Sequence, residues 1–317
     1  MTNAPALRRQ LSVVIPTYNR CGMLPDVLRP LLADPASTEV IVVVDGCHDG
    51  SWELLTDWAH REPRLRPIFQ ENAGQAAARQ AGVEAAHGEI VVILDDDVIA
   101  EPGLIGKHAD WHTDGESRLV LGYSATHPPL PRRPGQAPTI LYAEDHDQIC
   151  AKYESDPRYV LTNLWAGNMS LRRDDALRVG LDNDRHLRYH EDQLFGFRCE
   201  RAGLTPVFDR LLAATHSHSR SVAKFASECR IQGNARVKLT AEYPDLAPNI
   251  DASLELPTPT RLIVFALSAP LVAASSSLLL RAAAFVTGQA HRWALETVAV
   301  RLLRQVELRR GIRTASR

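Results

Sequence analysis

The stretch Ile90-Val91-Val92-Ile93-Leu94-Asp95-Asp96-Asp97 decides the fold that we expect for this chain. Its five apolar residues, entered from Gly88, predict a buried strand that ends on three adjacent carboxylates. In an open parallel sheet, ligands bind beyond the carboxyl ends of the strands. Three neighbouring carboxylates repel one another and need a cation or several hydrogen-bond donors. The stretch predicts either a site for a divalent metal that carries a phosphorylated ligand or an acidic cap after a strand, and alone it favours neither.

Three further strands are predicted upstream, at residues 11–15, 39–44 and 65–69, each followed by a polar segment. Helical patterns separate the later strands, and strands that alternate with helices are typical of parallel βαβ units. We therefore expect an α/β fold. The side chains that follow the four strands should meet at one edge of one sheet; they are those of Thr17, Asp45, Asn72 and Asp95.

Six segments, taken in order, resemble the family 2 glycosyltransferases. They are Ser12 to Asn19, Val43 to Ser51, Asn72 to Arg79, the D-x-D-like Leu94 to Asp97, Gly167 to Arg173, and the "ED"-like His190 to Leu194. The resemblance covers about residues 10 to 225. It implies a GT-A-type fold, with a Rossmann-like, mostly parallel sheet flanked by helices. Two departures stand out, because the second loop carries Asp45-Gly46 in place of two acids, and Gln80 replaces an asparagine.

The resemblance also implies an activity, which is metal-dependent transfer of a sugar from a nucleoside diphosphate-sugar to an acceptor hydroxyl, with inversion. A UDP-sugar is the first expectation for the donor, and Mn²⁺ or Mg²⁺ for the metal, because a divalent cation stabilises a departing diphosphate. Asp45 should accept from the nucleobase, Asp95 should bind the ribose, and Arg79 should pair with a diphosphate oxygen, although an exposed helix arginine is an equal alternative. The donor-binding residues are expected to be Pro16, Thr17, Tyr18, Asp45, Asn72, Gly74, Arg79, Asp95 and Asp96.

The same resemblance assigns the metal and the general base. The last acid of the D-x-D, Asp97, should hold the metal, and His216 or His218 should supply a further ligand. Alternate residues of an extended segment point to opposite sides, so only one of the two histidines is expected to reach the metal, His216 first. Asp192 should be the general base, with Glu191 orienting the acceptor, whereas the alternative for this pair is an ordinary acidic helix N-terminus.

Acceptor binding is expected from the segment around Trp165, Gly167 and Asn168. The indole of Trp165 can stack on a sugar face, although a core tryptophan is as compatible with the sequence. Gly167 and Asn168 belong to the segment that resembles the acceptor side of the family.

Composition narrows the functional classes. A formal net charge of −2 and the lack of a basic face give no reason to expect nucleic acid. Five scattered cysteines and an N-terminus without an apolar core predict a cytoplasmic protein, with the membrane face as an alternative. A nucleotidyl- or phosphotransferase is disfavoured because no Gly-rich phosphate loop is present. A non-catalytic sugar-nucleotide-binding protein is disfavoured by Asp97 and Asp192.

Two regions are predicted, a catalytic domain at residues 1–225 and a helical region at residues 226–317. In the second region, residues 262–280 carry no charge, and residues 291–310 form a basic amphipathic pattern. Pro270 and several serines make the uncharged stretch a poor membrane span. These stretches predict either peripheral contact with a membrane or packing, within the chain or in a homodimer. Residues 126–138 are rich in proline and predict a long loop.

Overall fold

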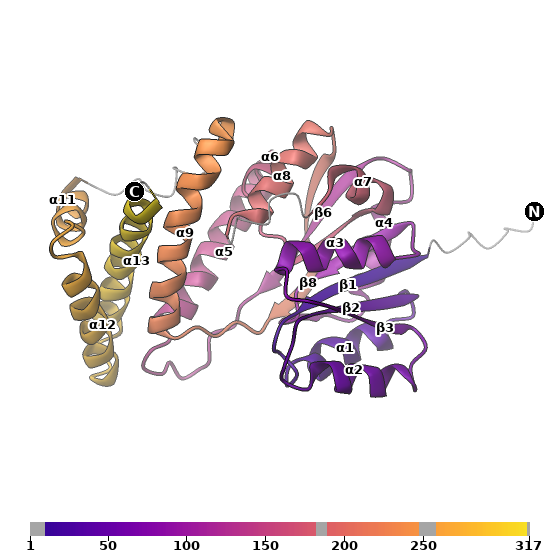
Figure 1. The fold of residues 1–317 in the computed structure, drawn as a ribbon, viewed down its shortest axis with the longest axis horizontal. Helices are drawn as coiled ribbons and strands as arrows, with labels where there is room; N and C mark the ends of the chain where they lie inside the picture. The colour runs from indigo at the N-terminus through magenta and orange to yellow at the C-terminus, as the bar shows by residue number, and fades with distance from the viewer. Residues whose placement is uncertain (1–9, 182–188, 247–257, 316–317) are drawn as a thin grey trace, which may run out of the picture. The chain divides into compact units, whose positions relative to one another are not determined.

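The computed structural model describes residues 10–181, 189–246 and 258–315 (Figure 1). The chain divides into two compact units, the first made of residues 1–125, 150–185 and 192–217, and the second of residues 126–149, 186–191 and 218–317. The strands are β1 (Leu11–Thr17), β2 (Glu39–Asp45), β3 (Leu65–Gln70), β4 (Ile90–Leu94), β5 (Val98–Ala100), β6 (Arg118–Ala125), β7 (Asn168–Arg172) and β8 (Thr205–His216). The helices are α1 (Leu24–Ala33), α2 (Ser51–Ala59), α3 (Gln75–Ala85), α4 (Leu104–Asp110), α5 (Ala137–Ser155), α6 (Arg158–Thr162), α7 (Arg173–Val179), α8 (Glu191–Arg201), α9 (Val222–Glu242), the 3₁₀ turn η1 (Pro244–Leu246), α11 (Thr258–Leu267), α12 (Ala273–Gln289) and α13 (Trp293–Ala315).

The first unit contains an eight-stranded sheet in the order β3-β2-β1-β4-β7-β6-β8-β5. β3, β2, β1 and β4 are parallel, whereas β7 is antiparallel to both β4 and β6. The predicted α/β fold is confirmed, and the four expected strands lie side by side with their carboxyl ends at one edge. The sheet is more mixed than predicted, because β5 also runs antiparallel to β8.

Helices cover both faces of the parallel half, so β1, β2 and β4 are buried along their whole length and are mostly apolar (Figure 1). Val13 and Ile15 of β1 pack with the leucines of α1 on one face. On the other face lies α3, which approaches closely because Gly82 has no side chain. A Cβ atom there would lie 2.3 Å from Cγ1 of Val14. The small residues of α3 therefore bring its N-terminal turns close to the strand ends.

β1 is longer than predicted, since it continues through Pro16 to Thr17. Its pairing with β4 ends at Val14, while its pairing with β2 continues to Thr17. Pro16 has no N–H to donate, and at this position β1 has a strand on the β2 side alone. The proline therefore ends the sheet on one side without ending the strand.

The second unit is helical, and its core contains residues of α5, α9, α12 and α13. α13 is the stretch in which we expected a basic amphipathic helix. Val300, Leu303 and Val306 of this helix are completely buried, so most of its apolar side packs within the unit. The expected uncharged stretch is broken, because α11 ends at Leu267 and α12 begins at Ala273. None of the helices in the described residues is long and apolar enough to cross a bilayer.

Candidate active site

Arg79 of α3 joins two of the predicted carboxylates. Its Nη2 donates to Oδ1 of Asp95 and its Nη1 to Oδ1 of Asp192, both at 2.7 Å. The residue is 3% exposed, so the alternative of a solvent-exposed helix arginine is wrong. Burial alone lowers the pKa of Arg79, but the two carboxylates raise it above its ordinary value. A permanently charged guanidinium therefore holds the end of β4 against the start of α8.

Asp192 is fixed by a second contact. The backbone N–H of Ala166 donates to its Oδ2 at 3.0 Å, so each carboxylate oxygen has a donor. The side chain nevertheless remains 28% exposed. Glu191, its predicted companion, is the first residue of α8 and is partly buried. Asp192 is thus oriented by two donors and remains accessible, two properties that a general base requires.

The three consecutive aspartates have different partners. Asp95 also accepts from Nε2 of Gln75 at 2.7 Å, and Asp96 accepts from the hydroxyl of Thr17 at 2.8 Å. Burial raises the pKa of Asp96 to about 6, although the nearby Arg20 acts in the opposite direction. Asp97 points to Arg20, whose Nη1 lies 2.9 Å from Oδ2. The run therefore spreads its three carboxylates over several donors, with Arg20 shared by Asp96 and Asp97.

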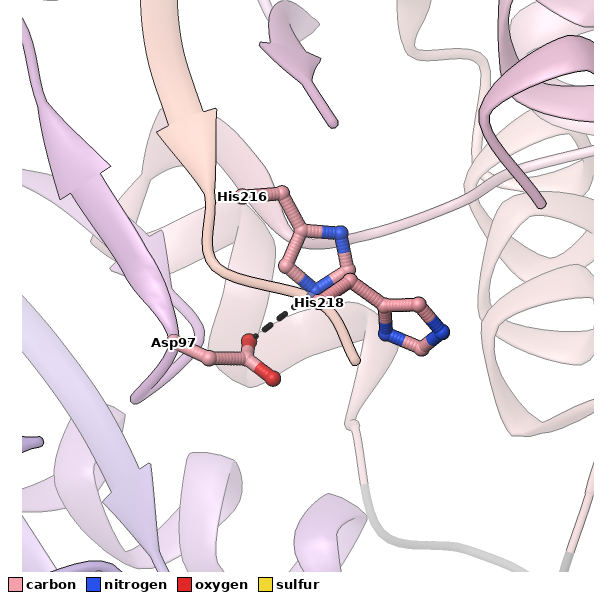
Figure 2. Close-up of side chains that lie close together, drawn as sticks. All are labelled: Asp97, His216 and His218. Atoms are coloured by element: carbon pink, nitrogen blue, oxygen red, sulfur yellow. Dashed lines mark ion pairs between the residues drawn. The ribbon is translucent and has the colours of Figure 1, made fainter. Parts of the chain in front are cut away.

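Asp97 lies beside two histidines at the end of β8 (Figure 2). Nε2 of His216 is 3.2 Å from Oδ1 of Asp97. Asp97, His216 and His218 each offer one ligand atom, and these atoms lie within 4.8 Å of one another. Both histidines lie near Asp97, because β8 ends at His216 and side chains alternate strictly only within an extended strand. The expectation that only one of them binds the metal stays a prediction. All three residues are among the ligands expected from the family resemblance, and their binding of a metal stays a prediction.

The charges of this region fit a cation. Four carboxylates (those of Asp95, Asp96, Asp97 and Asp192) face two guanidinium groups (those of Arg20 and Arg79), which leaves two negative charges in excess. One carboxylate and two imidazoles form a mixed ligand set that suits a first-row divalent ion better than Mg²⁺, which prefers oxygen. Arg20 is 36% exposed in its side chain, so it can leave Asp97 when a cation binds there.

Asp45 organises the neighbouring loop. Its carboxylate accepts from the backbone N–H groups of Ala73 and Gly74 at 2.8 and 2.9 Å, and from Nε2 of Gln70 at 2.8 Å. Asn72 in turn donates to the carbonyl of Asp45 at 3.0 Å. Asp45 is 3% exposed, so in this conformation it shapes the loop, and its expected contact with a nucleobase stays a prediction.

Gly46 explains one departure from the family pattern. Its φ is +69°, and a Cβ atom at this position would lie 2.8 Å from the backbone nitrogen of Asn72. An acidic residue would be both strained and in collision there. The second acid of the family pattern is therefore incompatible with the way this loop packs on Asn72.

The expected acceptor residues occupy two environments. Gly167 lies against Asp95, since a Cβ atom there would be 3.3 Å from its Oδ2, and the adjacent Trp165 is partly buried. Asn168, in contrast, is 1% exposed, and its amide donates to the carbonyl of Leu212 at 2.9 Å. Its Oδ1 lies 2.9 Å from Nε2 of His108. In this conformation the amide of Asn168 faces the interior of the unit.

His108, His112 and Ser170 form a buried hydrogen-bonded group that was not predicted from the sequence. Oγ of Ser170 lies 2.9 Å from Nδ1 of His108 and 2.9 Å from Nε2 of His112. Burial lowers the pKa of His108 to about 4, so its imidazole is neutral at pH 7. A neutral ring can donate to Asn168 through Nε2 and accept from Ser170 through Nδ1, which satisfies both ring nitrogens of His108.

Two residues near the carboxylates were also missed. Arg20 contacts Asp97, and Gln75 contacts Asp95. The available signal was positional, because Arg20 follows the first predicted strand and Gln75 follows Gly74, both at the predicted ligand edge. The remaining donor residues lie beside them, with Tyr18 52% exposed and Pro16 buried in β1.

The chain is similar in sequence to known proteins. A family model described as "Glycosyl transferase family 2" matches residues 12–176. An undecaprenyl-phosphate 4-deoxy-4-formamido-L-arabinose transferase of Aeromonas hydrophila is 43% identical over 98 residues, which cover 29% of this chain and 30% of the relative. A validoxylamine A glucosyltransferase of Streptomyces hygroscopicus subsp. limoneus is 27% identical over 271 residues, 76% of this chain and 58% of the relative. The chain thus spans less than two thirds of the length of either relative.

A solved structure shares the fold. It is the mannosyltransferase PcManGT of Pyrobaculum calidifontis in complex with GDP-Man and Mn²⁺, which superposes with a TM-score of 0.59. The match covers 96% of this chain and 88% of that protein at 18% sequence identity. At this identity the likeness concerns the fold, and it agrees with the GT-A-type architecture expected from the sequence.

Proposed function

We propose that this chain, which belongs to glycosyl transferase family 2, transfers a sugar from a nucleoside diphosphate-sugar to an acceptor hydroxyl with inversion and with the help of a divalent cation. One observation carries the proposal. Arg79 links the acid expected at the donor, Asp95, to the acid expected at the acceptor, Asp192. A donor site and a base are thereby held at a fixed separation, which is what direct transfer between two substrates requires.

The proposed base step uses Asp192. Its carboxylate removes the proton of the acceptor hydroxyl as that oxygen attacks the anomeric carbon, and the bond to the diphosphate oxygen breaks. Arg79 and the N–H of Ala166 orient the carboxylate but leave lone pairs on both oxygens. Because the acceptor attacks directly, with no covalent sugar–enzyme intermediate, the anomeric centre inverts.

Asp97, His216 and His218 would hold the cation. When bound, such an ion neutralises charge that develops on the leaving diphosphate. The two imidazoles favour Mn²⁺ over Mg²⁺ in this proposal. The complex of PcManGT with GDP-Man and Mn²⁺ gives the same combination of donor class and metal in a protein of similar fold.

The identity of the donor and acceptor is left broad. A UDP-sugar remains the first expectation, and a GDP-sugar is the alternative that the PcManGT complex adds. The names of the two relatives point to different acceptors, undecaprenyl phosphate in one and validoxylamine A in the other, so we propose no specific acceptor. All of the proposed groups lie before residue 225, so we assign catalysis to the predicted domain 1–225.

A cytoplasmic location remains a proposal. The five cysteines all lie in described residues and none forms a disulfide, which agrees with a reducing compartment. The expected homodimer likewise remains a prediction.

A donor screen tests the proposed function. Purified chain is incubated with UDP-, GDP- and dTDP-sugars in Mn²⁺, in Mg²⁺ and in excess EDTA, and released nucleoside diphosphate is measured. We expect release from one nucleotide class, in the presence of metal alone. Full turnover in EDTA would contradict metal dependence, and failure with every donor, with no nucleotide raising the melting temperature, would contradict the assigned reaction.

A further inference from the structure

Large apolar side chains are exposed on α11, on α12 and in the segment between them. We call this set the α11–α12 face. Each of its members is more than half exposed; they are Leu262, Ile263, Phe265, Leu271, Leu278, Leu279, Phe285 and Val286. Scattered exposed leucines are ordinary, but eight large apolar side chains exposed within residues 262–286 indicate an interaction site.

The spacing in α12 shows that the exposed side is one face of the helix. Leu278, Leu279, Ala282, Phe285 and Val286 recur at three- and four-residue intervals, which place them on one side of an α-helix. The opposite side of α12 is buried within the second unit. It carries the small residues Ala273, Ser276, Ser277, Ala284 and Gly288.

The buried side of α12 already has its partner in α13. The hydroxyl of Ser277 donates to the carboxylate of Glu307, and a Cβ atom at Gly288 would lie 3.1 Å from Oε1 of Glu296. Both glutamates are completely buried and are held by arginines of the same unit, Glu296 by Arg132 and Glu307 by Arg230. The side of α12 that packs inside the unit is thus small and polar, while the large apolar side chains point outward.

The charge of this region is of one sign. Residues 258–295 contain three arginines (Arg261, Arg281 and Arg292), all exposed, and no aspartate or glutamate. By helical spacing, Arg281 lies at the edge of the apolar side of α12, close to Leu278 and Phe285. Apolar residues rimmed by cations, without acids, are the pattern of helices that lie in the interface of an anionic bilayer.

We infer that the α11–α12 face docks on an anionic lipid surface, with both helices lying on the membrane rather than crossing it. A second copy of the chain fits this face less well. In a two-fold dimer the same patch meets itself, so the arginines would face arginines without acids to pair them. The sequence expectation offered both residues 262–280 and residues 291–310 for membrane contact. This inference keeps only the first region and extends it through α12, because Val300, Leu303 and Val306 of α13 are buried.

Vesicle flotation of the full chain tests the inference independently of any transfer activity. The probes are phosphatidylcholine vesicles with and without phosphatidylglycerol. We expect binding to the anionic vesicles, weakened by salt because part of the attraction is electrostatic. The double substitution Leu279→Glu with Phe285→Glu should weaken binding more than about tenfold, since two apolar side chains no longer enter the interface.

Two further variants keep the test sharp. Arg281→Glu reverses one charge at the rim and should reduce binding to anionic vesicles alone. Leu211→Glu is the matched control, because Leu211 is 74% exposed on β8 of the first unit, and it should bind like the wild type. Circular dichroism melting of each variant checks that the fold is retained, as expected for substitutions of exposed residues.

Three outcomes would overturn the inference. The first is a monomeric wild-type chain that binds neither kind of vesicle. The second is a dimer that dissociates in the double variant while the wild type ignores lipid, which would assign the face to a second copy. The third is equal loss of binding in the Leu211→Glu control, which would make the attraction unspecific.

Discussion

Replacing Asp192 by asparagine separates catalysis from architecture at the proposed base. The side chain keeps its shape, and the changes are the loss of the negative charge and of one acceptor oxygen. The wild-type carboxylate accepts from Nη1 of Arg79 and from the N–H of Ala166. An asparagine has a single acceptor oxygen, so one of these two donors loses its partner.

The structure allows both effects of this change to be estimated. A buried donor left without a partner costs about 1–3 kcal/mol of unfolding free energy, so Asp192→Asn should be less stable but folded. Loss of a general base lowers the turnover rate by about 10²- to 10⁴-fold, equivalent to about 3–5 kcal/mol in the transition state. Donor affinity should change by less than about threefold, because Asp95, Asp96 and Asp97 are untouched.

The assay combines transfer kinetics, calorimetry of donor binding and thermal melting. Asp174→Asn is the matched control, because Asp174 is an exposed acid in the first turn of α7, and its loss removes the same charge from a comparable helix end. A normal kcat in Asp192→Asn would refute the assignment and leave Asp192 as a helix-terminal acid. An equal loss of kcat in Asp174→Asn would also refute it.

Three further predictions concern the framework of the site. Gly46→Ala should destabilise the fold by about 2 kcal/mol or more and weaken donor binding. The control Gly135→Ala, also at positive φ but with nothing within 4 Å of the added Cβ atom, should cost about 1 kcal/mol and leave donor binding unchanged. Denaturant unfolding and calorimetry compare the two variants, and equal losses of unfolding free energy would contradict the collision with Asn72. The pKa of His108 falls from 6.5 to about 4 on folding, so the folded chain keeps this imidazole neutral at a pH where the unfolded chain protonates it. The free energy of unfolding should therefore fall by up to about 3 kcal/mol between pH 6.5 and pH 4. Urea unfolding should show a weaker pH dependence of this free energy in His108→Gln, and an unchanged dependence would refute the prediction. Arg79→Met leaves the carboxylates of Asp95 and Asp192 without their shared cation, so the free energy of unfolding should fall by about 3–5 kcal/mol. A variant as stable as the wild type would show that Arg79 does not hold the two carboxylates together.

The residues at the carboxyl ends of the parallel strands could be predicted from sequence, because the pattern that marks each strand end is local. Each apolar run of the parallel half is followed at once by a polar residue, and a parallel sheet brings all such ends to one edge. For this reason Thr17, Asp45, Asn72 and Asp95 were located correctly without any knowledge of packing. His216 and His218 were named through the resemblance to the family, and the structure places both beside Asp97.

The contacts between these residues could not be predicted, because they depend on segments far apart in the chain. The ion pair of Arg79 with Asp192 spans 113 positions, and it forms because Gly82 lets α3 settle on β1 and β2. Arg20 had no local signal beyond its place after β1. Local patterns thus identify which residues reach the edge, and packing decides which of them meet.

The same limit applies to the C-terminal helices. The pattern of residues 291–310 fits an interfacial helix and a packed helix equally, because both bury one apolar side. The structure separates them, since Leu303 and Val306 are buried in the second unit while Leu278 and Phe285 of α12 are exposed. The sequence pattern indicated that this region either contacts a membrane or packs against other helices. The arrangement of the helices then shows which apolar side chains are buried and which remain exposed.

Calorimetric titration of Mn²⁺ into the chain saturated with its nucleoside diphosphate tests the central claim most directly. The account predicts saturable binding in the wild type. It also predicts at least about tenfold weaker binding in Asp97→Asn and in His216→Gln, because each removes one of the three candidate ligands. Asp114→Asn, which changes an exposed carboxylate paired with Arg118, should bind Mn²⁺ like the wild type. Equal Mn²⁺ affinity in the wild type and in Asp97→Asn would contradict the account.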